Sequence, residues 1–193
     1  MLSGAAGRHA GDELGGVQFR PLLHQGDLPY VRQTAYTRAR AFKPGVVVID
    51  FGANDSKHPG DGSLEATNAV NNWQYKTNFA HDHEEMIAAF RRANSRTRIF
   101  ICLPTPDYPG RWGINDKTIR VEMIPIIRRV ARESDVSVID LYTALSGRKE
   151  LFPDTVHPDA AGAGLMAMTV YRALTGLAPP AGARDEHGPD GSQ

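Results

Sequence analysis

The sequence predicts an α/β protein, a three-layer α/β/α sandwich with a parallel sheet. Three apolar segments rich in β-branched residues, 46–51, 98–103 and 136–141, alternate with segments in which apolar residues recur at helical spacing. Strands that alternate with helices form βαβ units, whose right-handed crossovers give parallel strands. The run Val46 to Ile49 is β-branched throughout and has no polar alternation, which is typical of a strand covered on both faces.

Four helices are expected between and after the strands, at 30–42, 79–93, 117–132 and 159–175. Pro125 should kink the third, because proline removes one helical hydrogen bond. Gly176 is the natural end of the last helix. Small residues at 160–164 would let that helix pack closely at its start. The core-facing side of the third helix should carry Ile119, Met123, Ile127 and Val130.

The length of 193 residues suits one domain with a sizeable core. Residues 1–16 are rich in Gly and Ala without apolar periodicity, so we expect a disordered lead-in. The domain itself should span 17–177. Residues 178–193 are charged and rich in Pro and Gly, which predicts a disordered tail. Residues 55–78 should form a long loop.

Composition excludes several classes of function. Lys and Arg number 22 and so do Asp and Glu, which leaves no net field to attract nucleic acid or an acidic membrane. No apolar stretch approaches the ~20 residues of a membrane span, and 1–16 has no apolar core to act as a signal peptide. We therefore expect a soluble chain without membrane partners. The single cysteine, Cys102, excludes an internal disulfide and should be a small buried apolar residue.

A polar turn follows the first strand. Gly52, Asn54, Asp55 and Ser56 come directly after its carboxyl end, the position where open α/β sheets bind their ligands. The simpler alternative is a strand-to-loop turn with an Asx cap.

A second polar group precedes the last helix. Asp154 and His157 lie three residues apart between Pro153 and Pro158. A carboxylate that accepts the Nδ1 proton of a histidine fixes its tautomer and leaves Nε2 to take a proton from a serine. The alternative is that Asp154 caps the loop and His157 is a surface residue.

The polar turn reads Gly52-Ala53-Asn54-Asp55, and the second polar group lies in Phe152-Pro153-Asp154-Thr155-Val156-His157-Pro158. Together these two segments resemble the SGNH (GDSL-type) hydrolase superfamily, which comprises esterases and acylhydrolases of flavodoxin-like fold. The resemblance runs from about 17 to 174 and includes looser matches at 22–30, 113–116 and 139–142. Within the superfamily the chain looks most like bacterial carbohydrate O-acetylesterases, a group that includes sialate O-acetylesterase-like proteins.

The resemblance implies a role for each matching residue. Asn54 would be the side-chain donor of the oxyanion hole, and Gly52 would shape the turn that presents it. His157 would be the general base and Asp154 its orienting partner. Relatives of this type are often exported, so the compartment of this chain stays open.

The chain departs from the family pattern near its N-terminus. The family nucleophile is a serine in a Gly-Asp-Ser turn, whereas Gly11-Asp12-Glu13 has Glu in that place and no apolar strand before it. Phe19 stands where the second family block has a glycine. We therefore expect a truncated chain that lacks the nucleophile block and the first strand of the sheet, and has little or no esterase activity. Ser56 follows Asn54 too closely to be well aligned as a substitute nucleophile.

The predicted function is ester hydrolysis by a serine-His-Asp mechanism, deacetylating a carbohydrate or small ester, in a chain without an identified nucleophile. The alternative is a non-catalytic carbohydrate-binding module on the same fold. The aromatic residues expected in loops near the sheet edge would either stack on a sugar or cover the core; they are Trp73, Tyr75, Tyr108 and Trp112.

No cofactor or metal is expected. Glycine-rich nucleotide and phosphate loops are absent from the sequence. In His81-Asp82-His83 the histidines are two apart and would diverge on a helix, and His83-Glu84-Glu85 lacks the second histidine of a zinc helix. We expect this segment to be a solvated helix start.

Overall fold

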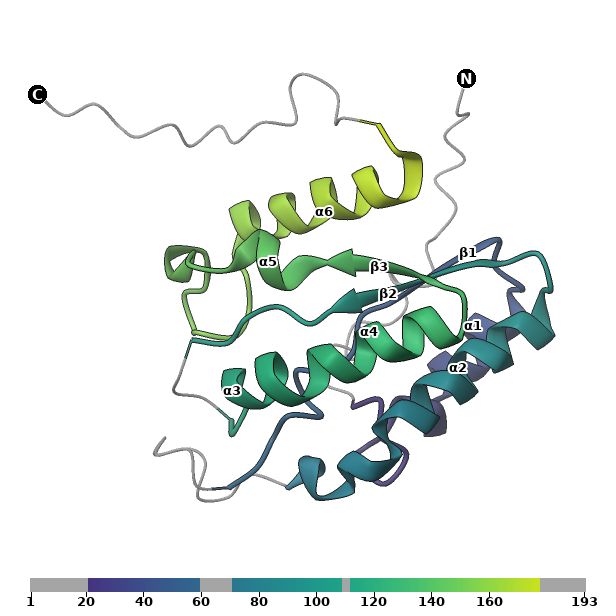
Figure 1. Ribbon diagram of the computed structural model, residues 1–193, viewed down its shortest axis with the longest axis horizontal. Helices are drawn as coiled ribbons and strands as arrows, with labels where there is room; N and C mark the ends of the chain where they lie inside the picture. The colour runs from purple at the N-terminus through teal and green to yellow at the C-terminus, as the bar shows by residue number, and fades with distance from the viewer. Residues whose placement is uncertain (1–20, 60–70, 109–111, 178–193) are drawn as a thin grey trace, which may run out of the picture.

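The computed structural model describes residues 21–59, 71–108 and 112–177. Its sheet has the parallel strands β1 (Val46–Ile49), β2 (Arg98–Leu103) and β3 (Ser137–Asp140), in that spatial order (Figure 1). This confirms the predicted parallel α/β architecture. The expectations for the lead-in at 1–16, for Phe19, for the absence of a first strand and for the tail from 178 lie outside the described residues.

Helices cover both faces of the sheet. The helices α1 (Thr34–Ala41), α2 (Phe79–Ala93) and α4 (Ile124–Glu133) lie on one face, and α6 (Ala160–Thr175) lies on the other (Figure 1). The short helix α5 (Leu141–Leu145) follows β3 directly. The larger core cluster lies on the side of α2 and α4. A smaller one joins Phe100, Cys102 and Ile139 to Met166 and Val170 of α6.

The strand β1 differs from the prediction of burial on both faces. Val47 and Ile49 point into the larger core, whereas Val46 and Val48 are 44% and 38% exposed. The reason is the position of α6, which packs on β3 and leaves the same face of β1 uncovered among the described residues. Cys102 is buried as predicted, and burial raises the pKa of its thiol.

Two predicted helices are interrupted. The segment 30–42 forms a 3₁₀ turn, η2 (Tyr30–Arg32), and then α1, because Gln33 between them has an extended backbone. The segment 117–132 comprises α3 (Asp116–Thr118), a π-helical turn η5 (Ile119–Met123) and α4. The π turn lies directly before Pro125, which cannot donate a helical hydrogen bond. The four residues predicted to face the core, Ile119, Met123, Ile127 and Val130, are fully buried.

The start of α6 is fixed by local contacts. Asp159 caps the helix, its Oδ1 accepting a hydrogen bond from the Gly162 backbone N–H at 2.8 Å. A Cβ on Gly162 would lie 2.8 Å from the Pro158 Cβ, so close packing at the helix start requires a glycine there. At the other end, Gly176 has φ +70° and terminates the helix as predicted.

The remaining elements are the 3₁₀ segments η4 (Asn72–Asn78), within the predicted loop, and η6 (Lys149–Leu151). In the described part of the chain, no helix combines the length and the apolar character needed to cross a membrane.

Candidate active site

The turn after β1 requires a glycine at position 52. Gly52 has φ +135°, a conformation that L-residues rarely adopt, and a Cβ there would lie 2.4 Å from Pro104 Cγ. Its carbonyl accepts a hydrogen bond from the Ser56 backbone N–H at 2.9 Å, which closes the turn around Asn54. The sequence-predicted residues Gly52 and Asn54 therefore share one tight turn at the carboxyl end of a strand.

Asp55 ties this turn to the segment that precedes η2. Its two carboxylate oxygens accept hydrogen bonds from the backbone N–H groups of Leu22, at 2.9 Å, and Leu23, at 2.7 Å. The side chain is fully buried. Desolvation raises the pKa of Asp55 to about 7, even though these hydrogen bonds act to lower it. Sequence analysis placed Asp55 in the polar loop but gave it no such role.

Asn72 fixes the backbone of Asn54 and was missed by sequence analysis. Its Nδ2 donates to the Asn54 carbonyl oxygen at 2.8 Å, and its Oδ1 accepts from the Asp27 backbone N–H at 3.0 Å. Asn72 is fully buried and Asn54 is 8% exposed. Asn72 lies in an asparagine-rich stretch without a motif, so only its position in the fold reveals its role.

Ser56 is a structural residue in this arrangement. Its hydroxyl donates to the Ala53 carbonyl at 2.7 Å and accepts from the Asn115 backbone N–H at 3.0 Å. The Ser56 side chain is fully buried. Two hydrogen bonds join the Asn54 turn to the segment after β2. One is the bond between Ser56 and Asn115, and in the other the His58 backbone N–H donates to the Gly113 carbonyl.

Asp154 and His157 form the pair that the sequence predicted. Asp154 Oδ2 lies 2.7 Å from His157 Nδ1, and Oδ1 accepts hydrogen bonds from the backbone N–H groups of Val156 and His157 at 3.0 and 2.6 Å. Thr155, at φ +74°, makes the reversal that allows one carboxylate to reach all three groups. His157 thus contacts the carboxylate through Nδ1; in a histidine base oriented in this way, Nε2 is the nitrogen that transfers the proton.

Tyr108 and the residues 112–115 contact both polar loops. Trp112 has φ +56°, and its ring centroid lies 5.3 Å from that of His157. The Tyr108 backbone N–H donates to the Thr155 carbonyl at 2.9 Å. Gly113 makes the contact with His58 described above. A continuous set of contacts therefore runs from the Asn54 turn through these residues to the Asp154–His157 loop.

The loop aromatics differ in burial and in their contacts. Trp73 is buried, packs edge-on against Phe79 at 5.3 Å and donates its Nε1–H to Glu122, so it covers the core. Tyr75 is half-buried against the same core. Tyr108 packs against Phe152. Trp112 is 38% exposed beside His157, which leaves part of its ring accessible to a ligand.

The prediction of a solvated helix start at 81–83 is wrong for two of its three residues. His81 is exposed, but Asp82 and His83 are 2% and 0% exposed. Asp82 faces the segment that contains His24, and His83 Nδ1 bonds to the Phe79 carbonyl at 3.0 Å. Burial lowers the pKa of His83 to about 4. The segment 21–29 contacts this end of α2 through His24, a long-range contact that the local pattern does not reveal.

We expect the Asp154–His157 pair to stabilise the fold in a pH-dependent manner. Desolvation would raise the pKa of Asp154, but its hydrogen bonds to His157 and Val156 outweigh that effect and lower the pKa to about 2. Because this value lies below the ordinary 3.8, the stabilisation is present above about pH 4 and is lost as the pH falls toward about 2. Solvent screening of the half-buried pair limits it to about 1 kcal/mol.

The measurement is the free energy of unfolding of the protein and of Asp154→Asn between about pH 2 and pH 6. The difference should be largest at the upper end and vanish at the lower end. A difference that does not change with pH would contradict this assignment.

Comparison with known proteins identifies the family. The model of the GDSL-like lipase/acylhydrolase family matches residues 15–165. This match covers more than half of the chain, and the chain belongs to that family, whose class is the carboxylic ester hydrolases.

Individual relatives agree with this assignment. An acetylxylan esterase of Xylanibacter ruminicola is 36% identical over 177 residues, which cover 82% of this chain and 34% of that protein. The chain thus spans about a third of the length of this relative. A lipase/acylhydrolase structure from Enterococcus faecalis has 26% identity and a TM-score of 0.54, covering 70% of this chain and 63% of that chain. A carbohydrate esterase family 3 structure from Talaromyces cellulolyticus shares the fold. Its sequence identity is 19% and its TM-score 0.53, and the match covers 75% of this chain and 64% of that chain.

Proposed function

We propose that this domain carries the base and oxyanion-binding half of an esterase site that removes acetyl groups from carbohydrates. The observation that carries the proposal is the Asp154–His157 pair, joined through residues 112–115 to the turn that presents Asn54. His157 Nε2 would take the proton from the attacking hydroxyl and return it to the leaving alcohol, while Asp154 stabilises the imidazolium. The Asn54 amide would donate to the oxyanion of the tetrahedral intermediate.

The acetylated carbohydrate is the substrate class that the observations favour. The acetylxylan esterase is similar over most of this chain. Trp112 offers a partly exposed indole beside His157, and an aromatic face of this kind packs well against the apolar face of a sugar ring. We propose that the acetyl group lies between Asn54 and His157 and that the sugar contacts Trp112.

The experiment measures binding and turnover of acetylated xylo-oligosaccharides separately. We expect saturable binding that is lost in Asn54→Ala and His157→Ala and weakened in Trp112→Ala. His81→Ala removes an exposed histidine from α2 and should bind normally, which makes it the matched control. Binding that is indifferent to Asn54 and His157 would contradict the proposal.

Turnover should be little or none, because the sequence has no Gly-Asp-Ser and carries Glu13 at the corresponding position. Hydrolysis of p-nitrophenyl acetate at the uncatalysed rate, together with saturable oligosaccharide binding, is the expected result. That outcome would also agree with the non-catalytic binding module. Turnover that disappears in His157→Ala would show that the chain is a complete catalyst and would overturn the expected inactivity.

A further inference from the structure

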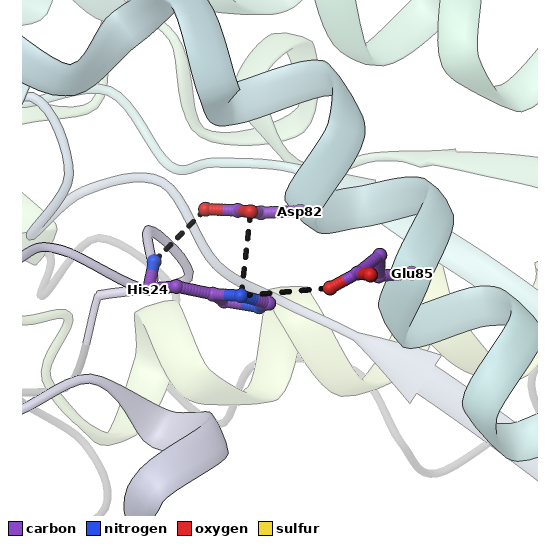
Figure 2. Close-up of side chains that lie close together, drawn as sticks. All are labelled: His24, Asp82 and Glu85. Carbon is purple, nitrogen blue, oxygen red and sulfur yellow. Dashed lines mark hydrogen bonds and ion pairs between the residues drawn. The ribbon is translucent and has the colours of Figure 1, made fainter.

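A second cluster of ionisable side chains lies where the segment 21–29 meets the first turns of α2. His24 comes from that segment, and Asp82 and Glu85 lie one turn apart on α2. Figure 2 shows one nitrogen of the His24 ring facing both carboxylates. No sequence motif indicates this cluster, because His24 lies far from residues 81–85 along the chain.

The distances in the cluster match the spacing of metal ligands better than that of hydrogen bonds. His24 Nδ1 lies 3.4 Å from Asp82 Oδ1 and 3.6 Å from Glu85 Oε2, and the three ligand atoms are all within 4.8 Å of one another. An N–H···O hydrogen bond is about 2.7–3.2 Å long. Bonds of about 2.0–2.2 Å from a tetrahedral metal separate neighbouring ligand atoms by about 3.3–3.6 Å.

The surroundings hold the ligands in place and are rich in negative charge. Asp82 Oδ2 accepts the His24 backbone N–H at 2.9 Å, which orients the other oxygen toward the cluster. Asp82 is 2% exposed, and within the described ranges its ion pair is with His24. Asp55 is close by: desolvation is the main cause of its raised pKa, and the negative charge of Asp82 raises that pKa further. Glu85 is half-exposed and provides a route from solvent.

We propose that His24 Nδ1, Asp82 Oδ1 and Glu85 Oε2 bind one divalent transition-metal ion, with Zn²⁺ the best match and water as the fourth ligand. An imidazole with two carboxylates suits zinc better than Mg²⁺ or Ca²⁺, which prefer oxygen ligands alone. The ion would join the segment 21–29 to α2. It would thereby secure the backbone N–H groups of Leu22 and Leu23 that hold Asp55, without taking part in ester hydrolysis.

The test uses the full chain after treatment with EDTA, titrated with ZnCl₂ and separately with MgCl₂ by calorimetry and thermal unfolding. One zinc ion should bind per chain and raise Tm, with a smaller effect of magnesium. His24→Ala and Glu85→Gln should each weaken zinc binding at least about tenfold, since even loss of a group that only orients a ligand costs 10–100-fold. Glu85 is half-exposed, so its variant should remain folded, and circular dichroism of the metal-free variants checks this.

His81→Ala is the matched control, because His81 Nε2 lies 3.6 Å from Glu85 Oε1 on the same helix and is exposed. Zinc binding should be unchanged in this variant. Zinc binding lost in His81→Ala but retained in His24→Ala would place the ion on the helix surface and overturn the proposal. Failure of zinc to raise Tm, in a protein whose stability still depends on His24, would show that direct contacts of His24 with the two carboxylates, and not a metal ion, join the segment to α2, and would also overturn the proposal.

Discussion

Replacing Asp55 by alanine should lower the free energy of unfolding by about 3 kcal/mol or more, because two buried backbone N–H groups would lose their acceptor at about 1–3 kcal/mol each. The carboxylate oxygens of Asp55 accept from Leu22 and Leu23 at 2.9 and 2.7 Å, and the side chain is fully buried. A loss of this size is a large part of a typical total of about 5–15 kcal/mol.

The measurement is thermal and urea unfolding of the protein, Asp55→Ala and two comparison variants. Tm should fall by roughly 6–12 °C in Asp55→Ala, at about 2–4 °C per kcal/mol for a chain of this size. Asp55→Asn keeps one acceptor oxygen and should lose less. Glu150→Ala removes an exposed carboxylate and should change Tm little. Equal stability of the alanine variant and the protein would contradict the role given to Asp55.

Replacing Gly52 by alanine should lower the free energy of unfolding by roughly 2–6 kcal/mol. The backbone conformation is unsuited to L-residues and the added Cβ overpacks the turn, and each effect costs about 1–3 kcal/mol. The added Cβ would meet Pro104 Cγ at 2.4 Å, and a proline ring cannot rotate away. The turn would have to shift and would carry Asn54 with it. Ligand binding through Asn54 should therefore weaken together with stability.

Gly147→Ala is the matched control for this prediction. Gly147 has φ +77°, and nothing lies within 4 Å of a Cβ built on it, so this variant carries the conformational cost without the clash. Chemical unfolding of both variants measures the two costs. Gly52→Ala should be clearly the less stable of the two. Equal losses in the two variants would mean that Pro104 yields, and would remove the argument that Gly52 positions Asn54.

Most of the fold follows from patterns within short segments. Apolar runs indicated each strand, and helical spacing indicated which residues of 119–130 face the core. The errors arise where distant parts of the chain decide the outcome. Val46 and Val48 belong to an apolar run, but the position of α6 decides whether their face is covered.

The candidate site divides in the same way. Asn54, Asp154 and His157 could be predicted because each belongs to a short motif whose chemistry is local. Asn72 and His24 could not, because each acts on a partner far along the chain: Asn72 on Asn54, and His24 on Asp82. Such long-range hydrogen bonds leave no periodic signal in the sequence.

The central claim is that the Asn54 amide and the His157 imidazole serve one pocket at the carboxyl edge of the sheet. The most direct measurement is an NMR titration with acetylated xylo-oligosaccharide that follows the side-chain signals of both residues in one sample. Both sets of signals should shift with the same dissociation constant, and Asn54→Ala should abolish the response of His157. Separate dissociation constants, or a His157 response that survives Asn54→Ala, would contradict a common pocket.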